Sequence, residues 1–228
     1  MPEGRYRAVL LDFDGTYADT ALDMIAALNA VRAEHAQTPV PIDTARPFVS
    51  HGATALVNLG FPGSTPAEKA RHITAFLAAY ARNVAEHTTL YDGMAQWIAA
   101  LEKAGVRWGI VTNKPEGLTH NVFATLAPVH PPHCVVAGDT LIKRKPHPMP
   151  ALHAAALLRV PAHQCLFVGD APADVLAGQS AGMHTVVAGY GYVRPFDNPV
   201  DWHADAVVDS VAALAAYTEP LLGLTSTL

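Results

Sequence analysis

Charged residues, cysteines and long apolar runs are all scarce in this 228-residue sequence, and each scarcity excludes a class of protein. Only 15% of the residues are charged and 50% are hydrophobic, which excludes a long disordered chain. No basic run is present, and 15 Lys and Arg against 20 Asp and Glu give a formal net charge of −5. Because nucleic-acid binding draws mainly on phosphate neutralisation, we expect no nucleic-acid partner.

The few cysteines and the short apolar runs also bear on location. Cys134 and Cys165 both stand in apolar, strand-like runs, where we expect buried free thiols and a reducing compartment. No stretch approaches the ~18 uncharged apolar residues of a membrane span, so we expect no membrane partner. The first apolar run is broken by Asp12, too early for a signal-peptide core. These features predict a cytoplasmic protein.

Short runs rich in Val, Ile and Leu alternate with helical patterns over most of the chain. The runs show no polar alternation, which is typical of strands covered on both faces. They occupy residues 8–13, 108–112, 134–137, 165–169 and 185–188, with a weaker run at 206–208. The helical patterns occupy residues 94–104, 116–126, 149–158, 173–181 and 211–222. Strand–helix alternation of this kind predicts an α/β fold with a Rossmann-like, doubly wound parallel sheet.

One segment near the N-terminus interrupts this alternation. Residues 17–89 contain no convincing strand, but residues 21–35 and 66–86 have helical patterns and residues 53–59 form a short apolar segment. We therefore predict an α-helical cap domain at residues 18–89, inserted into a catalytic core made of residues 1–17 and 90–228. The chain would cross between the two near residues 17–19 and 88–91.

Polar residues stand at or after the carboxyl ends of four predicted strands, where open parallel sheets bind their ligands. Each of them alone is commonly a turn residue, a helix cap or a surface charge. Their occurrence together, in this order, favours a functional site. They are Asp12 and Asp14 after the first strand, Thr112 and Asn113 after the second, Lys145 after the third, and Asp170 and Asp174 after the fourth.

Carboxylates dominate this group of residues. Asp12 and Asp14 would point to one side of an extended chain, and like charges that close require a cation. With Asp170 as a third carboxylate, the oxygen-only ligand set suits Mg²⁺. Lys145 and the hydroxyl of Thr112 could hold a phosphoryl group. A carboxylate nucleophile, a second carboxyl group and Mg²⁺ together predict phosphoryl transfer.

Four motifs in this sequence resemble those of the haloacid dehalogenase superfamily. They are LDFDGT at residues 11–16, VTNKP at 111–115, Lys145-Pro146, and Gly169-Asp170 followed by Asp174. The inserted helices resemble the small cap of the phosphoglycolate phosphatase-like members. The resemblance implies the haloacid dehalogenase fold and a phosphoric monoester hydrolase that forms an aspartyl-phosphate. It also implies Mg²⁺ as cofactor. The dehalogenases lack an acid at the position of Asp14.

The resemblance further implies a role for each matched residue. Asp12 would be the nucleophile, and Asp14 the acid/base that protonates the leaving group and then activates water. Mg²⁺ would be bound by the side chains of Asp12 and Asp170 and by the backbone carbonyl of Asp14, with Asp174 orienting the metal ligands. The implied phosphate-binding residues are Thr112, Asn113 and Lys145. Tyr17 departs from the family pattern, since Leu is usual there.

The core motifs do not identify the substrate. The segment between cap helices at residues 46–53 is the candidate for recognising it. Arg46 could pair with a substrate carboxylate and His51 with a hydroxyl, or the two could be a surface charge and a loop residue. Ser50 and Gly52 are the other candidate specificity residues of this segment.

The C-terminal part of the chain narrows the choice of small phosphorylated metabolite. The sequences GYGY at 189–192 and DNP at 197–199, followed by Trp202, resemble a branch containing phosphoglycolate and N-acetylmuramic acid 6-phosphate phosphatases, and look more like the latter. Both substrates carry a carboxylate and a phosphate. A sugar-phosphate mutase resembling β-phosphoglucomutase is the alternative, and a non-catalytic binding module is a third reading. The sequence leaves the oligomeric state open.

Overall fold

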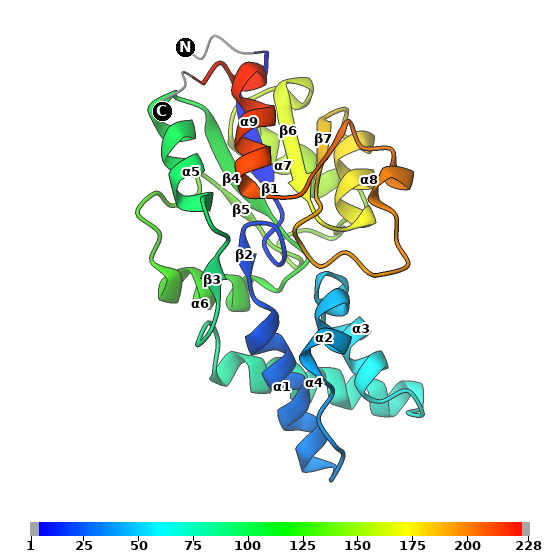
Figure 1. Cartoon of the computed structure of the whole chain (residues 1–228). Helices are drawn as coiled ribbons and strands as arrows, with labels where there is room; N and C mark the ends of the chain where they lie inside the picture. The colour runs from blue at the N-terminus through cyan, green and yellow to red at the C-terminus, as the bar shows by residue number, and fades with distance from the viewer. Residues whose placement is uncertain (1–4, 225–228) are drawn as a thin grey trace.

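A parallel sheet flanked by helices forms the larger part of the molecule in the computed structural model, which describes residues 5–224 (Figure 1). The strand order is β5-β4-β1-β6-β7-β8, and every neighbouring pair is parallel. The strands are β1 (Ala8–Leu11), β4 (Arg107–Val111), β5 (Val135–Val136), β6 (Cys165–Gly169), β7 (His184–Ala188) and β8 (Ala206–Val208). This arrangement confirms the predicted α/β class and its six strands.

Both faces of the sheet are covered, which explains why its strands show no polar alternation. Val9 and Leu11 of β1 pack into one hydrophobic cluster with α5 and α9, whereas Ala8 and Leu10 pack into another with α7. All four β1 residues are fully buried. The helices of this part are α5 (Met94–Lys103), α6 (Glu116–Leu126), α7 (Met149–Leu157), α8 (Pro172–Ser180) and α9 (Val211–Leu222), with 3-10 turns η2 (Ala162–Gln164) and η3 (Pro199–Trp202).

The remaining helices form a separate group beyond the carboxyl ends of the strands (Figure 1). They have a hydrophobic cluster that includes Leu28, Leu56, Phe76 and Tyr80. The helices are α1 (Ala21–Glu34), α2 (Ile42–Ala45), η1 (Arg46–His51), α3 (Gly52–Gly60) and α4 (Pro66–Arg82). The short helices α2 and η1 were not predicted, because segments of four and six residues are too brief to show a helical period.

The start of α4 shows how strongly the local sequence specifies this group. Thr65 and Glu68 form a reciprocal capping box, and Pro66 occupies the first turn. Together these residues satisfy backbone N–H groups that the helix itself leaves unpaired. The predicted start at residue 66 is therefore confirmed, whereas the helix ends at Arg82 rather than near residue 86.

Two short strands connect the cap helices to the sheet. β2 (Ala18–Asp19) pairs antiparallel with β3 (Thr89–Leu90). The prediction that residues 17–89 contain no strand is wrong here, because two-residue strands carry no periodic signal. Their position agrees with the predicted crossings, and we retain residues 18–89 as the proposed cap. None of the described helices combines the length and apolar character that crossing a membrane requires.

Tyr17 lies just before the first of these crossings and packs against the core. It is 1% exposed, and its ring stacks on Trp108 with centroids 5.6 Å apart. The rings of Phe13 and Phe123 also contact it, at 5.6 and 5.8 Å. Tyr17 is therefore a packing residue at the base of the cap.

Replacing Tyr17 by Ala should destabilise the protein by about 3–4 kcal/mol, because the substitution empties a fully packed aromatic site. Tyr17→Leu refills most of that volume and should cost about 1 kcal/mol. Urea unfolding measures both values. Leu157→Ala is the control, since Leu157 is 49% exposed and its loss should change stability by less than about 0.5 kcal/mol. Equal stability of the two Tyr17 variants would contradict this account of packing.

Candidate active site

The predicted site residues converge at the carboxyl ends of three adjacent strands. β1 lies between β4 and β6, so the loops after these strands meet at one edge of the sheet. Asp12 follows β1, Thr112 follows β4 and Asp170 follows β6. The sheet order thus explains how residues more than 150 positions apart become neighbours.

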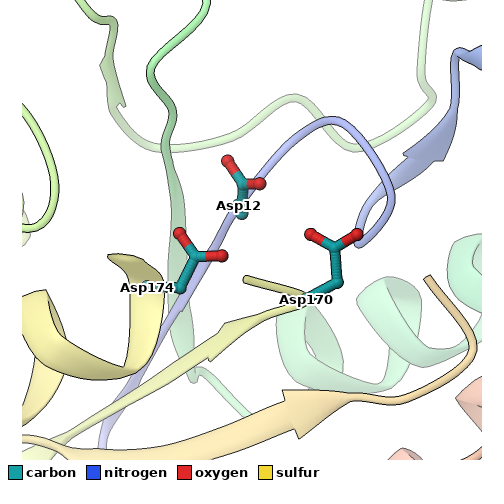
Figure 2. A group of neighbouring side chains, drawn as sticks. All are labelled: Asp12, Asp170 and Asp174. Carbon is teal, nitrogen blue, oxygen red and sulfur yellow. The ribbon is translucent and has the colours of Figure 1, made fainter. Parts of the chain in front are cut away.

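Three carboxylates form a compact acidic cluster at this edge. Asp12, Asp170 and Asp174 each place an oxygen within 4.8 Å of the other two. They project from separate segments toward the same side (Figure 2). Their exposures are 6%, 1% and 2%, so water screens their mutual repulsion poorly.

Lys145 neutralises part of this cluster. Its buried ammonium group lies 2.6 Å from Oδ1 of Asp12 and 2.7 Å from Oδ1 of Asp174. It also donates to the backbone carbonyl of Val111 at 2.7 Å. An ammonium group has three N–H donors, and all three are used here. Lys145 therefore joins the loop after β1 and the last residue of β4 to the start of α8.

Asp170 retains an unsatisfied oxygen. Its Oδ2 accepts hydrogen bonds from the backbone N–H of Tyr192, at 2.7 Å, and from the hydroxyl of Ser50. Its Oδ1 is buried and has no hydrogen-bond partner among residues 5–224. Burial and the charges of Asp12 and Asp174 raise the pKa of Asp170 well above its usual value. A bare, buried carboxylate oxygen is expensive unless a cation occupies the site.

The pKa of Asp12 is also raised, which indicates an excess of negative charge at the site. Burial, opposed in part by Lys145, raises its pKa from 3.8 to about 7. Counting Asp14 and Lys114, four buried carboxyl groups face only two buried lysines. The fully ionised site would thus carry two uncompensated negative charges. A divalent cation with oxygen ligands matches both this charge and the bare oxygen of Asp170.

Asp14 lies in a tight turn rather than on an extended strand. β1 ends at Leu11 and Gly15 has a φ of +91°, so the extended geometry on which the expected common direction of Asp12 and Asp14 depended does not persist. The Oδ1 atom of Asp14 accepts from the ammonium of Lys114 at 2.8 Å and from the hydroxyl of Thr20 at 2.6 Å. The turn gives Asp14 partners that differ from those of Asp12.

Thr112 and Asn113 act within the loop that follows β4. Thr112 is 3% exposed, and its hydroxyl accepts from the backbone N–H of Lys114 at 3.2 Å. Asn113 donates through Nδ2 to the carbonyl of Lys145 at 3.0 Å. These bonds fix the loop against Lys145. Thr112 is thus buried within this loop, whereas Asn113 is exposed and contacts the backbone of Lys145.

Arg46 reaches from η1 toward the crossing between cap and core. Its Nη2 donates to Oδ2 of Asp19 at 2.6 Å, and its guanidinium carbon lies 5.1 Å from the ring centroid of Tyr192. The hydroxyl of Tyr192 donates to Oδ1 of Asp19 at 2.7 Å and accepts from the backbone N–H of Thr20, also at 2.7 Å. Arg46 is therefore neither an isolated surface charge nor fully satisfied, since its guanidinium has five N–H donors.

Among the other residues of the predicted cap segment, Ser50 is the one with hydrogen bonds to the site in the described part of the chain. Besides Asp170, the Ser50 hydroxyl contacts the backbone carbonyl of Asp14 at 3.3 Å. Burial and the nearby charge of Arg194 lower the pKa of His51, which makes it mainly neutral at pH 7. Gly52 has a φ of +72° and open space where a Cβ would lie. Gly52 is thus explained by its left-handed backbone between η1 and α3.

Sequence reasoning did not assign Lys114, Thr20 and Tyr192 to the site. Lys114 lies within the matched motif VTNKP and Tyr192 is the last residue of GYGY, but nothing in a sequence shows that a lysine is 6% exposed or that a tyrosine backbone faces Asp170. A polar residue inside a recognised strand-end motif was the available signal for Lys114. No comparable signal existed for Thr20, which resembles an ordinary helix cap.

The raised pKa of Asp12 predicts how the metal-free protein responds to pH. The pKa of Asp12 is about 7 in the native state, against an ordinary value of 3.8. Ionising Asp12 in the folded protein therefore lowers the free energy of unfolding, and this loss grows as the pH rises from 3.8 to about 7. Asp12→Asn should therefore raise the free energy of unfolding of metal-free protein at pH 8 by about 1–3 kcal/mol, with a smaller gain at pH 5. Chemical denaturation at both pH values measures it. A destabilised variant, or a gain independent of pH, would contradict the electrostatic account; Asp43→Asn, in exposed helix α2, is the control.

Comparisons with known proteins agree with this geometry. Residues 9–188 match the model of the haloacid dehalogenase-like hydrolase family. A phosphoglycolate phosphatase from Xanthomonas campestris is 39% identical over 217 residues, covering 94% of this chain and 98% of that protein. An N-acetylmuramic acid 6-phosphate phosphatase from Pseudomonas aeruginosa is 39% identical over 210 residues, covering 92% and 93%.

A solved structure shares the fold at lower sequence identity. The crystal structure of a predicted phosphoglycolate phosphatase from Haemophilus somnus 129PT superposes with a TM-score of 0.84 at 23% identity, covering 95% of this chain and 99% of that one. The family model and the near full-length relatives confirm the predicted superfamily and the phosphatase class. The chain belongs to the haloacid dehalogenase-like hydrolase family.

Proposed function

We propose that this protein is a magnesium-dependent phosphomonoesterase that forms an aspartyl-phosphate on Asp12. The observation that carries the proposal is that two neighbouring carboxyl groups have different ion-pair partners. Asp12 is paired with Lys145 and Asp14 with Lys114, although the two acids are only two residues apart. Distinct environments of this kind suit one carboxylate to nucleophilic attack and the other to proton transfer.

In the first step, Asp12 attacks the phosphorus atom of the ester. Lys145 binds Oδ1 of Asp12, which leaves Oδ2 as the attacking atom. The new bond joins Oδ2 to phosphorus, and the bond between phosphorus and the ester oxygen breaks. Asp14 donates its proton to that departing oxygen, so the alcohol leaves as a neutral molecule.

In the second step, water releases the phosphate. Asp14, now ionised, takes a proton from a water molecule as its oxygen attacks the phosphorus atom. The bond between phosphorus and Asp12 breaks, which regenerates the Asp12 carboxylate and yields inorganic phosphate. Lys114 and Thr20 hold Asp14 throughout at one oxygen, Oδ1.

The divalent cation that we propose is Mg²⁺, which prefers oxygen ligands of this kind. The side chains of Asp12 and Asp170 and the backbone carbonyl of Asp14 would hold it, with Asp174 and Lys145 keeping Asp12 in place. When bound, the ion supplies positive charge that offsets the carboxylates and the phosphoryl oxygens. Thr112, Asn113 and Lys145 would bind those oxygens, for which Lys145 would exchange one of its three present acceptors.

The cap segment around η1 would recognise the leaving group. The free N–H donors of Arg46 suit a substrate carboxylate, and neutral His51 suits a hydroxyl group. We therefore propose N-acetylmuramic acid 6-phosphate or 2-phosphoglycolate as the substrate. The names of the relatives at 39% identity support both. The two buried, unpaired cysteines are consistent with a cytoplasmic enzyme.

Asp12→Asn should abolish phosphate release from p-nitrophenyl phosphate, because the amide is a far weaker nucleophile than a carboxylate. Removing divalent metal from the wild type should also abolish it, and Mg²⁺ should restore it. Colorimetric phosphate assays measure each result, with Asp43→Asn as the control. Retained turnover in Asp12→Asn, or an isomerised sugar phosphate in place of free phosphate, would contradict the proposal.

Substrate choice is tested by kcat/KM for N-acetylmuramic acid 6-phosphate and 2-phosphoglycolate under identical conditions. For the preferred substrate, Arg46→Ala should raise KM about tenfold or more, because a charged hydrogen bond to the carboxylate is lost. Arg82→Ala, an exposed cap arginine, is the matched control. An unchanged KM in Arg46→Ala would show that Arg46 does not bind the substrate carboxylate.

A further inference from the structure

We propose that Lys114 is a positioning residue that aims the Asp14 carboxyl group at the leaving oxygen, and that cap helix α4 governs this through Tyr80. The inference rests on the proposed function, since it concerns the acid of that reaction. It concerns a lysine that is neither a phosphate ligand nor a metal ligand in the proposed mechanism.

The core anchors Lys114 firmly at its backbone. Its N–H donates to the hydroxyl of Thr112 at 3.2 Å, and its carbonyl accepts from the backbone N–H of Gly138 at 2.9 Å. The side chain is 3% exposed and ends 2.8 Å from Oδ1 of Asp14. A lysine so fully desolvated is stable only when its charge is paired, and Asp14 is its ion-pair partner in the described part of the chain.

The two bonds to Asp14 meet at a single oxygen. Lys114 and the hydroxyl of Thr20 both donate to Oδ1, at 2.8 and 2.6 Å. Two donors on one oxygen fix the rotation of the carboxyl group and direct protonation to Oδ2. The ammonium group therefore sets which oxygen carries the transferable proton and where that oxygen lies.

The same ammonium group contacts the cap. Its Nζ lies 4.5 Å from the ring centroid of Tyr80, which belongs to α4. Tyr80 is 1% exposed within the hydrophobic cluster of the cap helices. A cation over an aromatic face is attracted to it and is also shielded from water by it. Lys114 thus connects the acid of the core to a helix of the cap.

This position differs from that of Lys145, the other buried lysine. Lys145 pairs with Asp12 and Asp174, both of the core, and lies 5.8 Å from the ring of Phe167, also of the core. Lys114 also lies 5.8 Å from the ring of Phe13 in the core, but its nearer ring contact, at 4.5 Å, is with Tyr80 of the cap. The carboxyl pair therefore divides into a nucleophile held within the core and an acid whose lysine depends on the docked cap.

The proposal predicts that the loss of rate on misplacing Asp14 depends on the basicity of the leaving group. A basic alkoxide or phenolate needs a proton as it departs, whereas p-nitrophenolate is stable enough to leave with little help. Misplacing Asp14 should therefore slow esters of basic alcohols more than esters of acidic ones. A residue that merely stabilises the fold would slow all esters alike.

The test compares p-nitrophenyl phosphate with phenyl phosphate, which differ in leaving-group basicity far more than in size. In Lys114→Met, kcat/KM should fall at least about tenfold further for phenyl phosphate than for p-nitrophenyl phosphate. Tyr80→Leu should shift the ratio in the same direction, and Tyr80→Phe, which keeps the ring, should preserve it. Circular dichroism and thermal unfolding verify that each variant is folded.

Equal loss on both esters, or none, in Lys114→Met would overturn the proposal. If that variant does not fold, Tyr80→Leu carries the test against its Tyr80→Phe control, and an unchanged ratio overturns the link to the cap. Failure of the proposed function would look different, since the wild type would then release no phosphate from either ester or Asp12→Asn would remain active.

Discussion

The structure depends on the concentration of negative charge at the carboxyl end of β1. Asp12, Asp14, Asp170 and Asp174 are each no more than 9% exposed. Carboxylates so close and so poorly solvated repel one another strongly unless cations lie between them. Two lysines supply part of that compensation, and a divalent metal would supply the rest. The arrangement of the surrounding loops follows from the need to hold these charges together.

The cap covers the site and also contributes to the compensation of its charges. Ser50 donates to the oxygen of Asp170 that also accepts from Tyr192, and Arg46 compensates Asp19 at the crossing from core to cap. Tyr80 lies over the lysine that holds Asp14. The cap therefore contacts Asp170, Asp19 at the crossing, and the lysine that holds Asp14. Docking of the cap and the electrostatics of the site are physically coupled.

Much of this could be predicted from the sequence, because the strong signals are local. Unalternating apolar runs identified the six strands, and the acids at their ends identified the loops that meet. The signals failed where a feature depends on tertiary contact. The turn at Gly15 separates Asp14 from the strand, and β2 and β3 are too short to show a period. The contact between Lys114 and Tyr80 of α4 forms only in the folded structure.

The cap segment shows the same limit at the level of single residues. The position of Arg46 between two cap helices suggested a role in reading the substrate, but its contacts with Asp19 and Tyr192 come from elements distant in sequence. Ser50 has no sequence signal that would connect it with Asp170, which lies 120 residues away. Such pairs are determined by the docking of cap and core, which no local pattern specifies.

The central claim is that Asp12 itself carries the phosphoryl group during turnover. The most direct measurement quenches the Mg²⁺-loaded Asp14→Asn variant with acid during its reaction with p-nitrophenyl phosphate and maps its peptides by mass spectrometry. The account predicts a phosphoryl group on the peptide that contains Asp12, released by hydroxylamine as expected for an acyl phosphate. A burst of p-nitrophenol with phosphate on another residue would contradict it.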